Sequence, residues 1–491
     1  MSLDSFPAFS TYRGVLMFLL APTLMLLFSK LTGIPMPKPV LYGVAAALGF
    51  VLVLRAYYNV ELILAVGILY FPFSKQFVVP IAPGLNGTNV FLILMLLAAF
   101  FQAQRNRISF LPMLPGTKII LAFFILSAGS ALTLWLTPGG FAFFMDDIWY
   151  VYKAWLDQFI LYFVALSIIR DREVAKRVVI YMAIGTFAVG LFTIPEMLEK
   201  TGVSNLDKAR LGGPHDQPNN FGGFIAYTLL PVIALFIVYI RYWRAWLVLP
   251  YMGLSVKLLI MSFSRGAYLA MAAAGLLTGY LRGKAFLFFW LFLAVAMLAM
   301  FPSLIPESIV ARISSTEQAT STSSQQLDKS SQTRLIMWEA AIEMTLEDPI
   351  IGKGFKAFPM LKDRYTDVYA HESDPHNMYL YVSSQMGIPA MVLFILMFLN
   401  MFEMGRKLSR NEDPYIRAIG IGGAGVSACV AIVNIFGSRF INIEFTCYFL
   451  ILYVVMQFLH KEQNEQLAEK EKERRRKRKF ATPVKAGGAA S

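Results

Sequence analysis

Arginine and histidine residues that could do chemistry occur in four short segments of the chain. Arg210 lies in RLGGPHDQPNN, Arg265 in SFSRG, Arg334 near the start of TRLIMWEAAIEMTLEDP, and His376 in HESDPHN. A guanidinium presents a planar fork of donors that suits phosphate oxygens. An imidazole titrates near neutral pH, so it can act as a general base. These residue types suggest anion binding combined with proton transfer.

Arg265 gives the sharpest of these signals, because it occupies a tight turn between two apolar runs. A cationic side chain at the middle of a bilayer costs about 2.5–3.5 kcal/mol, and less near the interface. One interpretation is an anion clamp, and the other is an arginine that reaches the interface and bonds nearby carbonyls. Lys257, two turns earlier, either adds to a positive pocket or pairs with a buried carboxylate such as Glu61 or Glu444.

Arg210 and His376 each have a functional and a structural interpretation. Arg210 lies in a Gly- and Pro-rich loop where backbone can approach a ligand closely, or it is a solvated loop arginine. His376 follows a proline, so we expect it to be held extended at the mouth of a helix that Asn377 caps. It is then either a general base or a polar residue at the interface.

The stretch that holds His371, Glu372, Asp374 and His376 could also suggest a metal site. Its spacing fits neither a helical pair of histidines four residues apart nor a Cys/His finger. We therefore predict no metal and no other cofactor.

Composition shows what must position these residues. The chain has 491 residues, 57% of them hydrophobic and 15% charged. Soluble domains have about 25% charged residues, and about 20 apolar residues span a bilayer. We predict an all-α polytopic transmembrane bundle of about 12–14 spans, with one long periplasmic loop that contains short helices. The candidate spans are 14–31, 39–56, 58–72, 88–104, 118–136, 155–169, 174–194, 219–240, 246–263, 266–281, 285–301, 377–403, 415–436 and 441–459.

Charge in the connections orients these spans. The net charge is +13, and much of it lies in the terminal run EKERRRKRK beside the last span. Such clusters bind anionic headgroups or set topology, so we predict contact with membrane lipids and no nucleic-acid partner. Connections rich in Lys and Arg alternate with poorer ones, which predicts cytoplasmic N and C termini. The expected units are spans in 1–301, a long periplasmic loop at 302–376, spans in 377–460 and a basic cytoplasmic tail at 461–491.

Together the motifs resemble the O-antigen ligase and polymerase superfamily, which are bacterial membrane glycosyltransferases of the GT-C type. The resemblance covers roughly residues 200–400, and each motif is short, but their order and their expected placement on one face are specific. The matching features are the arginine before a Pro-Asn pair (Arg210 to Asn220), the turn Ser264-Arg265-Gly266, Arg334 with Trp338 leading to Pro349 to Phe355, and the His-Asn pair before a Gly-containing helix (His376 to Pro389).

The resemblance implies an inverting, metal-independent transfer of a glycan from undecaprenyl diphosphate to an acceptor hydroxyl. It implies that Arg210, Arg265 and Arg334 bind the diphosphate and that His376 is the catalytic base. His371, Lys257 and Asn377 are accessory candidates. It places the site on the periplasmic face of the bacterial inner membrane.

The acceptor stays open at this point. A lipid A core sugar would make the protein a ligase, which we favour narrowly. The end of another carrier-linked repeat would make it a polymerase of O-antigen or exopolysaccharide. A protein Ser or Thr would make it an O-oligosaccharyltransferase. A different class, a flippase for lipid-linked oligosaccharides, should carry charge deep between two similar halves. Here the candidate residues fall in connections instead.

Overall fold

The structure is a computed structural model. It describes residues 59–76, 80–82, 85–133, 140–203, 205, 208–300, 329–366 and 373–481. The predicted spans 14–31 and 39–56 lie outside the described residues, and so does most of the polar tract that follows residue 301. Within the described part the chain is an all-α membrane bundle, as predicted. Nine helices there are long and apolar enough to cross a membrane.

Each predicted span that falls on described residues overlaps a helix. The long helices are α3 (Val60–Tyr70), α4 (Gly87–Arg105), α5 (Pro115–Leu132), α7 (Trp149–Ile168), α8 (Arg172–Lys200), α9 (Pro218–Tyr239), α10 (Leu249–Met261), α11 (Arg265–Arg282), α12 (Lys284–Met300), α14 (Lys329–Glu347), α16 (Met378–Leu408), α17 (Pro414–Val433) and α18 (Ile443–Ala481). The short elements are α6 (Gly140–Phe143), α15 (Phe358–Leu361), η2 (Phe71–Phe73), η4 (Phe144–Ile148), η5 (Gly213–His215), η6 (Trp243–Val248), η9 (Lys362–Arg364), η10 (Arg439–Ile441) and the antiparallel strands β1 (Pro80–Ala82) and β2 (Leu85–Asn86).

Local sequence explains where several of these helices begin. Asp171, Asn377 and Asp413 precede α8, α16 and α17, and each accepts a hydrogen bond from an otherwise unsatisfied N–H of the first turn. Proline occupies the first position of α9 and α17, where its missing N–H costs nothing. Asn86 and Asn89 form a reciprocal capping box at the start of α4.

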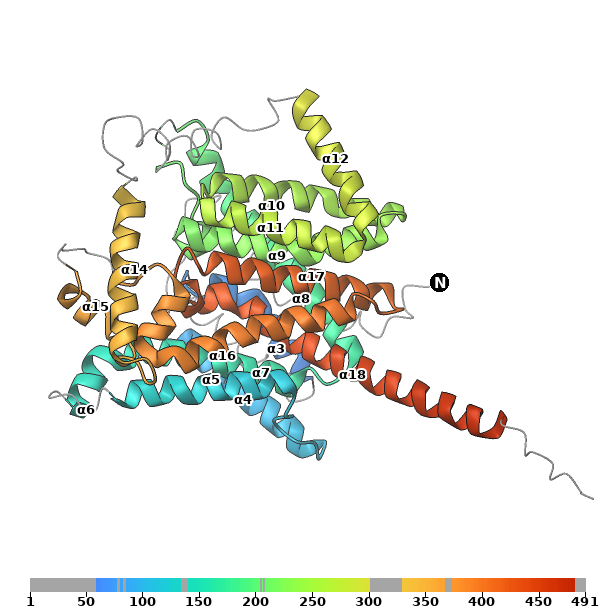
Figure 1. Cartoon of the computed structure of the whole chain (residues 1–491), viewed down its shortest axis with the longest axis horizontal. Helices are drawn as coiled ribbons and strands as arrows, with labels where there is room; N and C mark the ends of the chain where they lie inside the picture. The colour runs from blue at the N-terminus through green and yellow to red at the C-terminus, as the bar shows by residue number, and fades with distance from the viewer. Residues whose placement is uncertain are drawn as a thin grey trace, which may run out of the picture.

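The long helices run side by side, and the bundle has two distinct ends (Figure 1). The helix α14 stands across one end, which we name the α14 end. The exposed extension of α18 leaves at the other, which we name the tail end. Chain reversals alternate between these ends, so α9, α11, α16 and α18 all begin at the α14 end.

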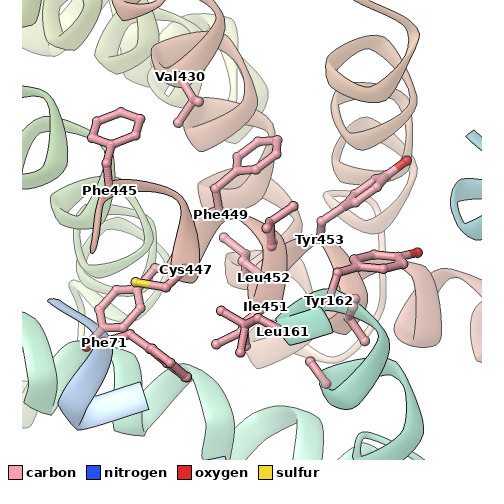
Figure 2. Close-up of a cluster of buried hydrophobic side chains, with 14 of the residues drawn as sticks. Phe71, Leu161, Tyr162, Val430, Phe445, Cys447, Phe449, Ile451, Leu452 and Tyr453 are labelled. Atoms are coloured by element: carbon pink, nitrogen blue, oxygen red, sulfur yellow. The ribbon is translucent and has the colours of Figure 1, made fainter. Parts of the chain in front are cut away.

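The core is built around the first half of α18. Every residue from Glu444 to Met456 is buried, which fits a helix that is apolar on all sides and surrounded by other helices. Phe449 and Tyr453 stack with ring centroids 6.3 Å apart, and Tyr453 lies 6.1 Å from Tyr162 of α7 (Figure 2). Cys447 is buried in the same cluster, and Cys429 is a second buried free thiol.

Glycines allow α16 and α17 to approach closely. A Cβ at Gly420 would lie 2.6 Å from the Leu408 carbonyl carbon, and one at Gly405 would lie 2.7 Å from the Gly420 oxygen. Close backbone contact of this kind is the usual way in which helices pack tightly within a membrane. The two helices therefore pack tightly against each other, and α16 begins at the α14 end.

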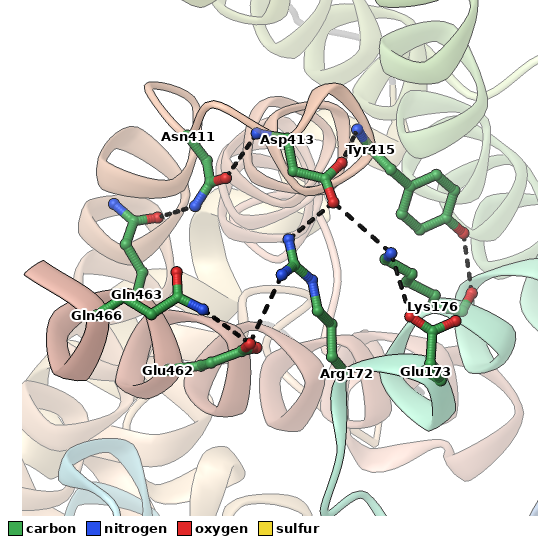
Figure 3. Close-up of polar contacts among 9 residues, drawn as sticks. All are labelled: Arg172, Glu173, Lys176, Asn411, Asp413, Tyr415, Glu462, Gln463 and Gln466. Carbon is green, nitrogen blue, oxygen red and sulfur yellow. Dashed lines mark hydrogen bonds and ion pairs between the residues drawn. The ribbon is translucent and has the colours of Figure 1, made fainter.

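A polar network ties α8, α17 and α18 together at the tail end (Figure 3). Arg172 lies 2.7 Å from Asp413 and 3.7 Å from Glu462, and Lys176 lies 3.6 Å from Asp413. Burial raises the pKa of Asp413, but the Tyr415 N–H and the two cations outweigh it, so this pKa stays below its ordinary value. The network gives the tail end a structural role that is separate from the predicted chemistry.

Candidate functional site at the α14 end

Arg210 joins the first turn of α9 to the connection between α10 and α11. Its Nη2 donates to Asn219 Oδ1 over 2.7 Å, and its Nε donates to the Ser262 carbonyl over 3.3 Å. A Cβ at Gly222 of α9 would lie 2.4 Å from Ser262 Oγ, so only glycine allows this contact. Arg210 is therefore a half-buried, oriented side chain and not a solvated loop arginine.

Arg265 is the first residue of α11, directly after a strained turn. Phe263 has a φ of 48°, in the left-handed region that is uncommon for bulky side chains. Ser264 is the N-cap, yet its hydroxyl is buried and has no hydrogen-bond partner among the described residues. A helix N-terminus favours negative charge, because its unsatisfied N–H groups and its dipole both point outward. Arg265 is half-buried at this positive end.

His376 sits in a turn that Asp374 organises. Asp374 Oδ1 accepts a 2.7 Å hydrogen bond from the His376 N–H, and His376 Nδ1 lies 3.4 Å from the same oxygen. The prediction that His376 is extended is wrong, because its φ is 51°. An aspartate that bonds a backbone N–H two residues on folds the chain into a turn, and this overrides the extended tendency. The imidazole remains 34% exposed, so a substrate can reach it.

The 374–377 turn is held against the connection between α17 and α18. Ser438 Oγ donates to Asp374 Oδ1 over 2.7 Å, and the Met378 N–H donates to the Asn434 carbonyl over 2.8 Å. The same connection reaches α11, because a Cβ at Gly266 would lie 3.0 Å from Phe436 Cβ. The His376 turn and the Arg265 turn therefore both contact the connection between α17 and α18. The described contacts thus bring three of the four predicted segments to one end of the bundle.

Arg334 enters this region on α14, near a second arginine that lies in η10. Burial and the nearby charge of Arg334 lower the pKa of Arg439 to about 9. One side of α14 packs through Met337, Ala340 and Met344, which are fully buried, and Arg334 lies one turn before Met337 on that side. Through its proximity to Arg439, Arg334 also belongs to the α14 end.

A short ladder of hydrogen bonds fixes α14 against α16. The helix α16 is broken at Gly387, which has a φ of 85°, and the segment after α14 fills the break. Ile388 N–H donates to the Pro349 carbonyl over 2.7 Å, and Gly354 N–H donates to the Gln385 carbonyl over 3.0 Å. The Gly352-Lys353-Gly354 stretch therefore positions α14 relative to the helix that follows His376.

This ladder predicts that Gly352→Ala lowers both stability and activity. Gly352 has a φ of 74°, and its Cβ would lie 2.4 Å from the Gln385 carbonyl carbon, so the segment must shift. A residue forced into such a conformation costs about 1–3 kcal/mol. The matched control is Gly253→Ala, because nothing lies within 4 Å of its Cβ. Thermal unfolding in detergent should show a lower melting temperature for the first variant only, and an unchanged Gly352→Ala variant would contradict the positioning role.

The accessory candidates have different outcomes. Asn377 caps α16, with its Oδ1 accepting from the Tyr379 and Leu380 N–H groups. His371 lies outside the described residues. Lys257 is exposed on α10 and forms no ion pair with a described residue. The pairing of Lys257 with Glu61 is wrong, because Glu61 bonds Arg177 and Tyr181 near the tail end.

His215, the histidine within the Arg210 segment, is a packing residue. It is fully buried, its ring lies 4.8 Å from the Phe224 ring, and neither ring nitrogen has a hydrogen-bond partner among the described residues. Burial, reinforced by the Lys75 ammonium, lowers the pKa of His215 to about 3. The histidine is therefore neutral at physiological pH and cannot act as a cation toward a substrate.

His215 also predicts a pH dependence of stability. The pKa is about 3 in the folded protein, against about 6.5 when unfolded, so the unfolded state binds more protons between these values. Stability then falls as the pH drops below about 6.5, by about 2 kcal/mol at pH 5. His215→Phe should remove this loss and keep the contact with Phe224. Melting temperatures of both proteins at pH 7.5 and pH 5 test this, and the same pH dependence in both would contradict it.

Residues 250–395 match the model of the family described as O-antigen ligase. This segment is similar to that family. No curated protein matches the chain. The match confirms the resemblance predicted from the motifs, and it includes Arg265, Arg334 and His376, whereas Arg210 lies outside the matched residues.

The match therefore shows that this part of the chain is similar to O-antigen ligases. Among the described residues, no group of three or more His, Cys, Asp or Glu side chains could hold a metal ion. His371 and Glu372 lie outside them, so the metal-free expectation stays a prediction.

Sequence reasoning missed Asp374 and Arg439 as residues of this site. Asp374 was considered only as a metal ligand, although an aspartate two residues before His376 could have suggested the turn. Arg439 lies in GSRFIN, between two apolar runs, as Arg265 does. The signal that singled out Arg265 was therefore present at Arg439 as well.

Proposed function

We propose that the protein transfers a glycan from undecaprenyl diphosphate to an acceptor hydroxyl at the α14 end. The favoured reaction is that of an O-antigen ligase, with lipid A core as acceptor. The observation that carries the proposal is the convergence of Arg210, Arg265 and the Asp374–His376 turn at one end of a membrane bundle. The similarity of residues 250–395 to O-antigen ligases supports the same chemistry.

The transfer is proposed to proceed with inversion. The acceptor hydroxyl oxygen attacks the anomeric carbon from the face opposite the diphosphate. A bond forms between that oxygen and the carbon, and the bond from the carbon to the diphosphate oxygen breaks. The hydroxyl proton passes to His376, and undecaprenyl diphosphate leaves with the bonding electron pair. No nucleotide is needed, because the diphosphate is itself the leaving group.

His376 suits the role of base through its surroundings. Asp374 lies 3.4 Å from His376 Nδ1 and also bonds its backbone N–H, so the ring is oriented and its protonated form has a nearby negative charge. The other ring nitrogen is then the one that accepts the acceptor proton. A positioned general base of this kind contributes typically about 10²–10⁴ in rate.

The arginines are suited to stabilise the diphosphate as it leaves. Negative charge on the diphosphate grows as the sugar–phosphate bond breaks, and a preorganised guanidinium stabilises that charge without having to reorient. Arg210 is oriented by Asn219 and the Ser262 carbonyl, and Arg265 lies at the positive N-terminus of α11. Arg334 is proposed to orient the diphosphate or the first sugar.

The proposed location is the bacterial inner membrane, with the α14 end in the periplasm and both termini in the cytoplasm. The support is the distribution of Lys and Arg, including the basic run of 471–479 at the tail end. A cysteine introduced in place of Thr320 should react with a membrane-impermeant reagent applied from the periplasmic side. Labelling only from the cytoplasmic side would overturn this orientation.

The metal-independent mechanism predicts that a chelator leaves activity unchanged. Guanidinium groups supply the positive charge that a divalent cation would otherwise supply. Transfer by the purified protein should therefore be equal with and without EDTA. Loss of activity in EDTA that added Mg²⁺ or Mn²⁺ restores would exclude this mechanism.

Acceptor choice separates ligase, polymerase and protein glycosyltransferase. Purified protein with one undecaprenyl-diphosphate glycan should be offered lipid A core, a carrier-linked repeat and a Ser/Thr-containing protein in parallel. The proposal expects product on lipid A core. Product only on the carrier-linked repeat would identify a polymerase, and product only on protein an O-oligosaccharyltransferase.

A further inference from the structure

Arg439 is a buried cation without a described counter-charge. The residue is 2% exposed, and no described carboxylate forms an ion pair with it. Its Nη1 donates to the Val433 carbonyl, and its Nε is buried with no hydrogen-bond partner among the described residues. An arginine in this state uses only part of its donor fork.

The surroundings of Arg439 are positive. Arg334 lies close enough for its charge to disfavour the charged form of Arg439. A Cβ at Gly223 of α9 would lie 3.5 Å from Arg439 Cδ, so the side chain lies against the N-terminal part of that helix, whose dipole is positive. Ser438, the preceding residue, bonds Asp374 and hence contacts the His376 turn.

A buried arginine in positive surroundings destabilises the protein when no ligand is bound. Removing a charge from water is costly unless a counter-charge or several hydrogen bonds compensate, and a nearby cation adds to the cost. The same arrangement favours a bound anion with more than one charge, because such an anion supplies the counter-charge that Arg439 lacks among the described residues. Phosphate oxygens are suited to this, since they accept charge-assisted hydrogen bonds from a guanidinium.

We propose that Arg439 is a positioning residue of the donor site, a buried cation whose counter-charge is the diphosphate of the lipid-linked donor. This inference rests on the proposed function. Arg439 acts through the electrostatic field that it shares with Arg334, and Ser438 links it to the Asp374–His376 turn. The bound diphosphate therefore neutralises the charge of Arg439 near His376, the base that takes the acceptor proton.

A purely structural role is the competing explanation, in which Arg439 serves only to bond the Val433 carbonyl at the end of α17. The two roles differ in what happens when the charge is removed. If the role is structural, Arg439→Gln lowers the stability of the ligand-free protein. If the charge of Arg439 instead binds an anion, Arg439→Gln leaves the stability of the ligand-free protein equal or higher and weakens diphosphate binding.

The test uses the purified full chain in detergent with farnesyl diphosphate as probe and farnesyl phosphate as comparator. Arg439→Gln should weaken farnesyl diphosphate binding by about tenfold or more, with no fall in the melting temperature of the ligand-free protein. It should also raise KM for the lipid-linked donor more than it lowers kcat. A lower ligand-free melting temperature with wild-type diphosphate affinity would overturn the proposal.

Arg170 supplies the matched control. It is half-buried near the tail end and bonds only backbone carbonyls among described residues, those of Ser109, Phe110 and Ser167. Arg170→Gln should leave diphosphate affinity unchanged. If the Arg439→Gln variant does not fold, Arg439→Lys replaces it. Lysine keeps the charge through which Arg439 acts, so an affinity close to that of the wild type is expected, and a loss as large as that of Arg265→Ala would overturn the proposal.

The outcomes also separate this inference from the proposed function. If the wild-type protein does not prefer farnesyl diphosphate over farnesyl phosphate, the proposed donor site fails, and this inference fails with it. The outcome differs if the wild type shows that preference, Arg265→Ala loses it and Arg439→Gln retains it. In that case only the proposed role of Arg439 is lost.

Discussion

Arg265→Ala is expected to lower kcat/KM for a lipid-diphosphate donor by roughly 10- to 100-fold, because a hydrogen bond to a charged group contributes about 1.5–3 kcal/mol. The side chain lies at the N-terminus of α11, next to the buried hydroxyl of Ser264. Transfer of a fluorescent glycan by the purified variant measures the effect. Arg265→Lys should recover part of the activity, since lysine supplies the charge but not the planar fork.

The control for this prediction is at the other end of the same helix. Arg282 is the last residue of α11, and its Nε donates to the Ile237 carbonyl over 3.4 Å. Arg282→Ala removes an arginine of the same kind without touching the α14 end, so transfer should stay near the wild-type rate. Equal losses in the two variants would mean that Arg265 acts through the packing of α11 and not on the diphosphate.

His376→Asn is expected to lower kcat by about 10²–10⁴ while the KM for donor changes little, because a general base acts in the transition state. The short amide side chain leaves the turn formed by Asp374 in place. Single-turnover transfer with saturating donor separates the chemical step from binding. The control is His460→Asn, which alters a histidine of α18 near the tail end.

Two results would exclude His376 as the base. One is a His376→Asn variant that transfers glycan at the wild-type rate. The other is a variant that loses donor affinity and catalytic rate in proportion, which would point to a role in binding. The Asp374→Asn variant should show a smaller loss of kcat than His376→Asn, because Asp374 acts on the ring and not on the substrate.

The bundle was largely predictable because a bilayer imposes one simple rule. Spans must be apolar for about 20 residues, and each predicted span on described residues does overlap a helix. The order of spans then predicts which connections share an end of the bundle. That is why Arg210, Arg265 and His376 could be assigned to one end before any distance was known.

The direction in which a side chain points was not predictable from the same rule. Lys257 lies on α10, where apolar residues occupy almost every position, so no hydrophobic stripe shows which side is buried. The structure buries Ser255, Leu258 and Leu259, and this turns Lys257 outward. Its predicted pairing with a buried carboxylate failed for that reason.

Contacts between segments that are distant in the chain could not be predicted from the sequence either. Ser438 bonds Asp374 across a separation of 64 residues, and this contact places η10 beside the His376 turn. Nothing local to Arg439 shows that it is buried, or that the nearby charge is another arginine. The left-handed conformation of His376 arises from a single hydrogen bond to Asp374, which outweighed the tendency expected from the preceding proline.

The fate of the carrier lipid tests the central claim most directly. Purified protein in liposomes, with a labelled undecaprenyl-diphosphate glycan and an acceptor, should release one undecaprenyl diphosphate for each glycan transferred. The Arg265→Ala and His376→Asn variants should lower both products together. Movement of the intact lipid-linked glycan across the bilayer, without cleavage of the sugar–phosphate bond, would contradict the account and indicate a flippase.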